Sequence, residues 1–370
     1  MIQRLIQRLF NRAARELVTR FDVHPARVGW RHVPPVRITD LEHRVVHPAG
    51  TSTAPLPRNV ASRDALSRDR RITGFSFDDV PQRELEPTIV AEARDCRILI
   101  ATDVWGDRHY AILTRERRQL HVRGTYFQRA LHAPLVEAPA VRMPHATWIL
   151  EAWDRNYAHW LQWHLTKIVL LEGTDDFLIP PRTGFAGASL DLLHAPGIEL
   201  PGNVIDVERL TVIGMDSYRP SLLRALRAQL ATNAQPARRL FISRRDASRR
   251  RLLNEDRCWS LLESHGFERV FMEDHSFAQQ VAMMQEAAAV VALHGAGLAN
   301  ILFAPEGAHV VEIADEAFPN PQYYALSACM GHHYWLLQAR PAGEYRPGYH
   351  DLVADEEELA RVLPEVVASL

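Results

Sequence analysis

Lysine is almost absent from this chain. Lysine and arginine together number 43, and all but one of them, Lys167, are arginine. Aspartate and glutamate number 45, so the formal net charge is only −2. A chain without net positive charge has no general electrostatic attraction to nucleic acid or to an anionic membrane. The composition therefore argues against nucleic acid as a partner.

Cysteines and long apolar runs are also scarce. The three cysteines, Cys96, Cys258 and Cys329, are far apart and form no Cys-x-x-Cys pair. This spacing indicates neither a disulfide framework nor a zinc site. No apolar run approaches the roughly 18 residues that a membrane-spanning helix needs. We expect a cytoplasmic protein with no metal site.

Residues 1–21 have an amphipathic pattern but lack the unbroken apolar core of a signal peptide. One face carries Ile2, Leu5, Ile6, Leu9 and Phe10, and arginines lie elsewhere. We expect a helix that packs on the body of the protein. The alternative is peripheral contact with the inner face of a membrane, because such a helix can lie on an anionic surface.

The length of 370 residues and the apolar fraction of 47% predict two globular domains. We divide the chain into an irregular lead-in with the amphipathic helix (1–95), a first α/β domain (96–200), a second α/β domain (201–340) and a terminal tail with a helix (341–370). Strands alternate with helices through the second domain, which predicts a doubly wound parallel sheet. Ligands should bind at the carboxyl ends of its strands, in a cleft between the two halves.

The segment 289–313 predicts a strand, a glycine turn, a short helix and another strand. The turn, His294-Gly295-Ala296-Gly297, leads into Leu298 and leaves backbone N–H groups at the positive end of a helix, which suits a phosphate. Asn300 occupies the place of the third glycine of the dinucleotide fingerprint, so the motif is weak evidence for NAD. The alternative is a tight turn that only packs a helix on a sheet.

Two further groups are predicted at the same edge of the sheet. Arg244 and Arg245 directly follow a strand, and guanidinium groups match phosphate oxygens in pairs. Glu312 ends the strand after the glycine turn, where a carboxylate can accept hydrogen bonds from ribose hydroxyls. The alternatives are a solvated arginine-rich loop and a strand-end acid that faces solvent.

A third cluster lies at a loop-to-helix junction in the first half. His159 titrates near neutrality and is the first candidate for a general base, with Asp154 as the second. Asn156 belongs to the same cluster. The alternative assigns Asn156 to the N-cap of a helix and makes His159 an interior histidine.

An Asp-x-Asp motif is also missing. The nearest variant, Asp206-Val207-Glu208, lies at the predicted domain junction and not beside the glycine turn. A paired-carboxylate magnesium site for a nucleotide diphosphate is therefore not indicated. We expect no cofactor and no metal, with arginines and a helix N-terminus neutralising the phosphates.

The ordered set of motifs resembles the family 61 glycosyltransferases, known in bacteria as capsular polysaccharide biosynthesis proteins. The resemblance covers roughly residues 145–340 and rests on three stretches, which are Asn156 to Leu161, Arg239 to Asp246 with Leu253-Asn254-Glu255, and His294 to Asn300 with Glu312-Ile313. It implies a GT-B-like α/β fold, in which two Rossmann-like domains face each other across a cleft. It also implies inverting, metal-independent transfer from a nucleotide-sugar donor, UDP-linked by expectation, to a hydroxyl of a glycan acceptor.

The same resemblance implies a role for each cluster. The turn from His294 to Leu298 with Asn300, together with Arg244 and Arg245, would hold the donor diphosphate, and Glu312 would hold the ribose. Asn156 and His159 would face the reacting centre from the acceptor side, and residues 1–95 would help to shape the acceptor site. The alternatives are a non-catalytic nucleotide- or sugar-binding protein of polysaccharide assembly and an NAD-dependent oxidoreductase.

Overall fold

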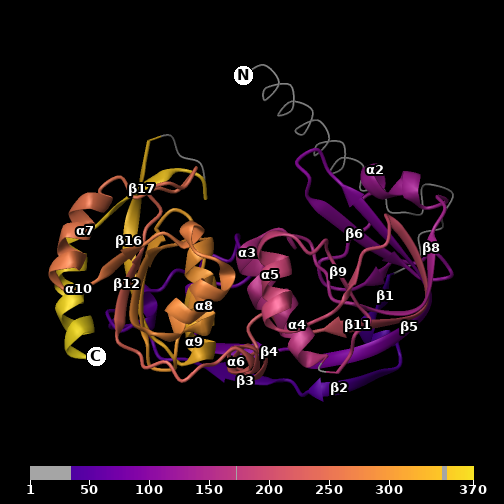
Figure 1. Cartoon of the computed structure of the whole chain (residues 1–370), viewed down its shortest axis with the longest axis horizontal. Helices are drawn as coiled ribbons and strands as arrows, with labels where there is room; N and C mark the ends of the chain where they lie inside the picture. The colour runs from indigo at the N-terminus through magenta and orange to yellow at the C-terminus, as the bar shows by residue number, and fades with distance from the viewer. Residues whose placement is uncertain (1–34, 172, 344–347) are drawn as a thin grey trace.

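The protein is described here by a computed structural model that covers residues 35–171, 173–343 and 348–370. Two sheets, each with helices packed against it, lie side by side along the longest axis of the molecule (Figure 1). The predicted α/β class is confirmed. The predicted amphipathic N-terminal helix lies outside the described residues. No described helix is long and apolar enough to span a membrane.

The first sheet is mixed and not purely parallel. Its order is β10-β9-β8-β11-β5-β2, and β6 also pairs with β5. The first four of these strands run parallel, whereas β5 is antiparallel to β11, β2 and β6. The strands are β2 (His43–His47), β5 (Thr88–Thr102), β6 (Arg108–Leu113), β8 (Val141–Trp148), β9 (Phe177–Ile179), β10 (Ile198–Glu199) and β11 (Val204–Gly214). A parallel Rossmann-like sheet was therefore the wrong prediction for this half.

The strand β11 also corrects the predicted boundary at residue 201. The sequence pattern predicts this strand at the start of the second domain. In the structure, β11 pairs along its length with β5 and along seven positions with β8, both in the first sheet. Most of its apolar side chains are fully buried, as expected for a central strand. The lead-in also contributes β2 and the start of β5 to this sheet. The chain passes to the second sheet only after Gly214.

One helical stretch follows β8, as predicted for residues 159–171. It begins with α3 (Tyr157–His159), continues through the π-helical turn η6 (Trp160–His164) and ends with α4 (Leu165–Leu170). Such π-turns are rare and occur frequently at functional sites. The other short elements of this half are β1 (Val36–Arg37), η2 (Ile38–Asp40), β3 (Gly50–Thr53), η3 (Arg63–Ala65), η4 (Phe77–Asp79), β4 (Gln82–Leu85), β7 (Leu120–His121), α2 (Arg129–His132), η5 (Ala133–Leu135) and α5 (Gly184–Leu192).

The second sheet has the predicted doubly wound form. Its order is β13-β12-β14-β15-β16-β17, parallel except for β17, which is antiparallel to β16. The strands are β12 (Arg238–Ile242), β13 (Glu268–Val270), β14 (Ala287–Leu293), β15 (His309–Asp315), β16 (His333–Ala342) and β17 (Asp351–Ala354). The direction of winding reverses between β12 and β14, which makes their junction the switch point where doubly wound sheets bind ligands.

Helices cover both faces of the second sheet. On the outer face, α7 (Glu255–Ser264) and α10 (Glu356–Ala368) close a separate hydrophobic cluster (Figure 1). The inner elements are α6 (Pro220–Gln229), η7 (Met272–Asp274), α8 (Phe277–Gln285), the 3-10 helix η8 (Ala296–Phe303) and α9 (Gln322–Met330). Side chains of these elements pack against the first half.

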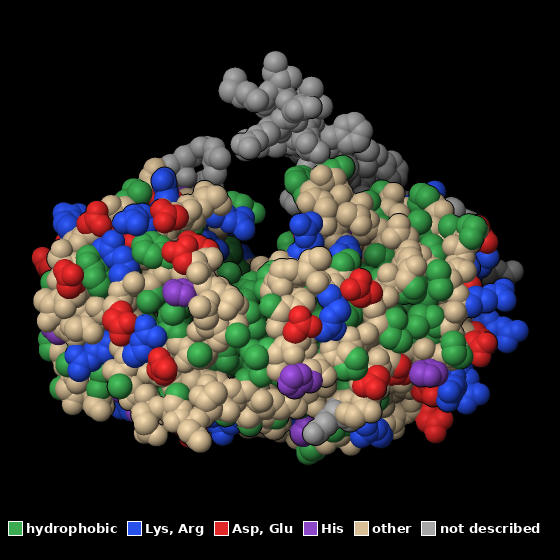
Figure 2. Space-filling model, in the orientation of Figure 1, with side chains coloured by type: hydrophobic (Ala, Val, Ile, Leu, Met, Phe, Trp, Pro, Cys, Tyr) green, Lys and Arg blue, Asp and Glu red, His purple; other side chains and the backbone are tan. Residues whose placement is uncertain are grey.

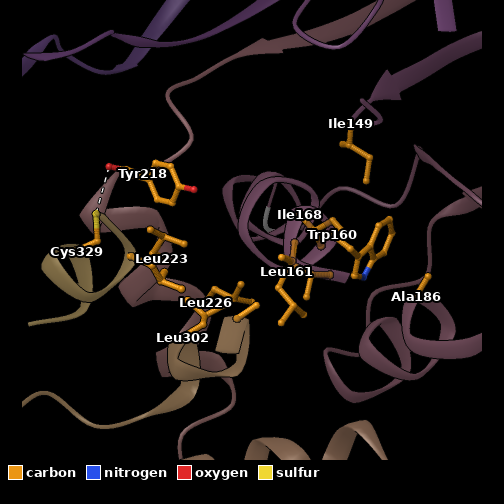
Figure 3. Packing of buried hydrophobic residues seen from close by; sticks show 14 of the residues in the cluster. Ile149, Trp160, Leu161, Ile168, Ala186, Tyr218, Leu223, Leu226, Leu302 and Cys329 are labelled. Carbon is orange, nitrogen blue, oxygen red and sulfur yellow. Dashed lines mark hydrogen bonds between the residues drawn. The ribbon is translucent and has the colours of Figure 1, made fainter. Parts of the chain in front are cut away.

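One hydrophobic core joins the two halves. Leu223 and Leu226 of α6 lie beside Leu302 of η8, and Trp160 and Leu161 of the first half pack nearby (Figure 3). All five side chains are fully buried. Because apolar surface is removed from water on both sides of this junction, the core fixes how the halves meet. The molecule is hollowed between them on the side opposite this junction (Figure 2).

Candidate functional site

The two predicted donor-site segments meet at the switch point of the second sheet. Arg244 follows β12 after one residue, and His294 follows β14 directly. The strands β12 and β14 are parallel neighbours, with Ile242 opposite Ala292 at the carboxyl end of the pairing. Both segments therefore lie at the same edge of the sheet, at the position where doubly wound sheets have their ligand crevice.

Gly295 makes room for the Arg244 guanidinium. Its φ angle of 177° is extended backbone that any residue adopts, so glycine is not needed for conformation. A Cβ atom at this position would lie 2.8 Å from Arg244 Cζ and 3.1 Å from Nε. The first distance is shorter than real Cβ contacts and the second is tighter than most, so a larger residue at this position would displace the guanidinium from the turn.

Arg244 is held by main-chain carbonyls. Its Nε donates to the oxygen of Arg250 at 3.3 Å, and its Nη2 donates to the oxygen of Arg249 at 3.1 Å. Burial lowers the pKa of Arg244, and the nearby positive charge of Arg250 lowers it further. Among the residues that the structure describes, no carboxylate forms a salt bridge with this guanidinium.

Arg250 is a second, partly buried cation beside Arg244, and no sequence motif had indicated it. Burial lowers its pKa, and its Nε lies buried without a hydrogen-bond partner in the described part of the chain. Its φ angle of 55° is in the left-handed region, where ordinary side chains are rarely found. Two neighbouring guanidinium groups that form no salt bridge with a described carboxylate favour the binding of an anion. The only sequence signal for Arg250 was the arginine-rich stretch 238–251.

Arg245 points away from Arg244. Its guanidinium lies over the ring of Phe271, 5.1 Å from the centroid, and its Nε is 3.7 Å from Asp246. The side chain is more than half exposed. The two consecutive arginines therefore do not form the expected pair, and only Arg244 enters the crevice.

Glu312 is a partner of His294 and is not open to a ribose. One carboxylate oxygen lies 2.5 Å from His294 Nδ1, and the other accepts from the Tyr334 hydroxyl at 2.5 Å. The side chain is fully buried. Because both oxygens are engaged, the predicted ribose contact of Glu312 is not supported. Glu312 instead fixes the ring of His294 through the contact at Nδ1.

The remaining turn residues shape the crevice. Ala296 and Gly297 are partly exposed, whereas Leu298 is buried. Asn300 is fully buried and donates to the Gly297 oxygen at 3.0 Å. It also accepts from the Tyr157 hydroxyl at 2.5 Å, which ties the turn to α3 of the first half. Asn300 therefore acts as a brace of the turn, and its side chain does not face a ligand.

A pocket of about 400 Å³ lies between the halves. The first half contributes His159 and Trp163, and the second contributes Asn320 and Gln322. The complete lining is Ile72, Thr73, Phe75, Arg123, Gly124, Tyr126, Glu151, Ala152, Trp153, His159, Trp163, Ser217, Tyr218, Asn320 and Gln322. This volume falls within the range of about 300–1,000 Å³ that small-molecule sites occupy.

His159 is the predicted catalytic residue that lines this pocket. Its ring stacks on Trp163 with centroids 3.9 Å apart. Burial lowers the pKa of His159 to about 4, although the negative charge of Glu151 opposes this change. Its Nδ1 is buried, and within the described ranges it has no hydrogen-bond partner. The imidazole is therefore neutral at pH 7 and able to accept a proton.

Asn156 and Asp154 have structural partners. Asn156 Oδ1 accepts from the His159 N–H at 3.2 Å, which confirms the N-cap alternative. Asp154 is buried and accepts from Arg108 Nε at 2.9 Å and from the Tyr110 hydroxyl at 3.0 Å. Asp154 does not line the pocket that contains His159, so the structure does not support Asp154 as the base.

The only lysine of the chain, Lys167, contacts Glu151, which lines this pocket. Lys167 Nζ lies 2.5 Å from Glu151 Oε1 and donates to the Ile149 carbonyl at 3.0 Å. Arg123 reaches the other Glu151 oxygen at 3.1 Å. Burial alone would raise the pKa of Glu151, but these two cations hold it below its usual value. No local pattern in the sequence indicated this cluster, because its members come from three separate segments.

The described residues contain no group of three or more histidine, cysteine, aspartate or glutamate side chains that could hold a metal ion.

One family model matches the central part of the chain. Residues 157–311 match the family model described as Glycosyltransferase 61. The matched region contains His159, Arg244, Arg250 and the glycine turn, whereas Asn156 and Glu312 lie just outside it. The match supports the resemblance to family 61 glycosyltransferases.

Animal proteins show a more local similarity. Protein O-linked-mannose beta-1,4-N-acetylglucosaminyltransferase 2 of Homo sapiens is 46% identical over 55 residues, or 15% of this chain and 9% of the relative. The Mus musculus protein of the same name gives the same figures, and that of Xenopus tropicalis is 47% identical over 58 residues. The chain thus spans about 9% of the length of these relatives. These matches support a glycosyltransferase but do not show the bacterial capsular type.

Proposed function

We propose that this chain is an inverting, metal-independent glycosyltransferase that moves a sugar from a nucleotide-sugar donor to a hydroxyl of a glycan acceptor. The observation that carries the proposal is a pair of partly buried guanidinium groups at the switch point, that of Arg244, which lies against Gly295, and that of its neighbour Arg250. The family match over residues 157–311 supports it. In this proposal the two halves have the GT-B-like roles of acceptor side and donor side.

The donor side binds the diphosphate. Burying a cation without a counter-ion costs several kcal/mol, and an anion in the crevice offsets this cost. Arg244 presents a planar fork that matches phosphate oxygens, and Arg250 supplies further contacts. As the sugar–phosphate bond breaks, negative charge grows on the departing diphosphate. Each preorganised donor that meets this charge is worth about 3 kcal/mol of barrier lowering, which is the role a metal ion has in other enzymes.

The acceptor side supplies the base. His159 removes the proton of the acceptor hydroxyl while the oxygen attacks the anomeric carbon, and the nucleoside diphosphate leaves from the opposite face. This single displacement inverts the anomeric configuration. A base with a pKa of about 4 is weak. Binding of a dianionic donor next to the pocket raises the pKa of His159 toward neutrality, because negative charge favours the protonated imidazole.

The finer assignments follow the resemblance. We propose a UDP-linked donor, a cytoplasmic location and a glycan acceptor of bacterial surface polysaccharide synthesis. Peripheral membrane contact through residues 1–21 belongs to the same proposal. The acceptor-side domain corresponds to the first sheet with β11, and the donor-side domain corresponds to the second sheet.

Calorimetric titration tests the donor site. The purified chain is titrated with UDP, GDP, CMP and NAD, first in EDTA and then in magnesium. We expect UDP to bind most tightly of the four. Its dissociation constant should be the same in EDTA and in magnesium. The Arg244→Ala variant should bind UDP about 10-fold to 100-fold more weakly, because hydrogen bonds to charged groups contribute about 1.5–3 kcal/mol.

The exposed Arg94 provides a control outside both sites. Its side chain is 78% exposed, and Arg94→Ala should leave UDP binding unchanged. Three results would overturn the donor assignment. They are tighter binding of NAD than of UDP, UDP binding that requires magnesium, and a dissociation constant of UDP that is unchanged in Arg244→Ala. Nucleotide binding without turnover of any acceptor would indicate a non-catalytic binding protein.

A further inference from the structure

Two aromatic side chains line the pocket but remain largely exposed to water. Trp153 is 60% exposed and Tyr126 is 52% exposed, whereas most large apolar side chains of the described chain are buried. Both belong to the first half, on the loops that follow β7 and β8. An exposed aromatic ring adds little to folding because its apolar surface stays in water.

The backbone at Trp153 is also strained. Its φ angle of 71° is in the left-handed region, which is costly for a bulky side chain. Such conformations cost on the order of 1–3 kcal/mol and cluster at ligand sites. A strained tryptophan that is not buried contributes little to stability, so its position is best explained by a ligand.

The surroundings of these rings identify the chemistry of that ligand. Trp153 meets His159 edge to face, with centroids 6.4 Å apart and planes at 88°. Arg123 Cζ lies 4.3 Å from the centroid of the Trp163 ring, and Arg123 is paired with Glu151. The positive and negative charges on this side of the pocket therefore balance each other. A pyranose ring has two faces of C–H bonds and a rim of hydroxyls, which match aromatic faces surrounded by hydrogen-bonding groups.

The opposite wall supplies neutral hydrogen-bonding groups. Asn320 and Gln322 come from the second half, and Thr73 and Ser217 complete the polar lining. Amide and hydroxyl groups both donate and accept hydrogen bonds, as sugar hydroxyls do. With no unpaired acid or base exposed on the Arg123–Glu151 wall, the pocket fits an uncharged sugar.

We propose that Trp153 and Tyr126 form the acceptor subsite, in which the ring of a neutral pyranoside stacks beside His159. Stacking on Trp153 places a sugar hydroxyl at the histidine that the proposed mechanism uses as its base. The identity of this sugar as the acceptor rests on the proposed function. The existence of a pyranoside site does not, because it follows from the pocket alone.

Saturation-transfer NMR with methyl glycosides tests the site directly. The probes are the methyl pyranosides of glucose, galactose, mannose and N-acetylglucosamine, each with and without UDP. We expect transfer to the ring protons of at least one probe in the wild type. Trp153→Ala should bind that probe about tenfold more weakly, the loss expected for roughly 50–60 Å² of apolar contact. Trp153→Phe, which keeps an aromatic face, should restore most of the binding.

Trp105 gives a matched control. It is 56% exposed, nearly as much as Trp153, but it does not line the pocket, so Trp105→Ala should bind the probe normally. The dissociation constant of UDP, measured in parallel, should be the same in all of these variants. If Trp153→Ala fails to fold, Tyr126→Ala replaces it and should weaken binding of the same probe.

Two results would overturn the subsite. The first is a wild type that shows no transfer to any probe, and the second is an equal loss in Trp105→Ala and Trp153→Ala. Failure of the donor proposal gives a different pattern, in which UDP does not bind although a glycoside does. The two proposals therefore fail separately.

Discussion

Replacement of Gly295 by alanine tests whether the glycine turn acts through Arg244. The added Cβ would lie 2.8 Å from Arg244 Cζ, so the guanidinium has to leave the turn. It then loses its bonds to the carbonyls of Arg250 and Arg249. We expect the free energy of unfolding to fall by about 1–3 kcal/mol, as for other overpacked sites, and UDP affinity to fall about 10-fold to 100-fold.

A double-mutant cycle separates this mechanism from a general disturbance of the turn. The dissociation constant of UDP is measured for Gly295→Ala alone and for Gly295→Ala combined with Arg244→Ala. Gly50→Ala is a separate control, because a Cβ added at Gly50 meets nothing within 4 Å. If the alanine acts by displacing Arg244, it causes no further loss of UDP affinity once Arg244 is gone. Full additivity of the two losses in calorimetry would refute this reasoning, and Gly50→Ala should match the wild type.

Three further changes probe other parts of the structure. His159→Asn should reduce sugar transfer by about 10²–10⁴-fold and leave the UDP dissociation constant unchanged; near-normal turnover would assign the base elsewhere. Glu312→Gln should weaken UDP binding by several-fold in calorimetry and lower stability by about 1–3 kcal/mol, because His294 loses a charged partner; unchanged values would show that the pair is not needed. Burial lowers the pKa of His332 from 6.5 to about 3, so the unfolded chain binds the proton first as the pH falls. His332 should therefore lower the free energy of unfolding by about 1.4 kcal/mol for each pH unit between about pH 6 and pH 4. Urea titrations at several pH values should show that the free energy of unfolding of His332→Gln falls less steeply with falling pH than that of the wild type.

The sequence predicted the parts of the fold that depend on local pattern. The second sheet followed from alternating strands and helices, and the switch-point crevice followed from the positions of Arg244 and Gly295 at strand ends. The N-cap of Asn156 likewise depends on a few adjacent residues. These features need no knowledge of distant contacts.

Features that depend on distant partners could not be predicted. Glu312 seemed free because its second partner, Tyr334, comes from the next strand, 22 residues later. Asp154 seemed a candidate base because Arg108, 46 residues earlier, was not known to reach it. The assignment of β11 to the first sheet depends on pairing with β5, more than a hundred residues away in sequence. In each case the deciding partner comes from a distant part of the chain.

Lys167 offers a spectroscopic use of the unusual composition. The chain uses arginine at every other basic position, so growth on isotopically labelled lysine would place a single amine signal in the whole molecule. That signal arises beneath the pocket, where the ammonium group is almost fully buried and contacts Glu151. The chemical shift of an ammonium nitrogen depends on the electric field of nearby charges. The Lys167 shift should therefore change when a ligand binds in the pocket, and no reporter group has to be added to the pocket itself.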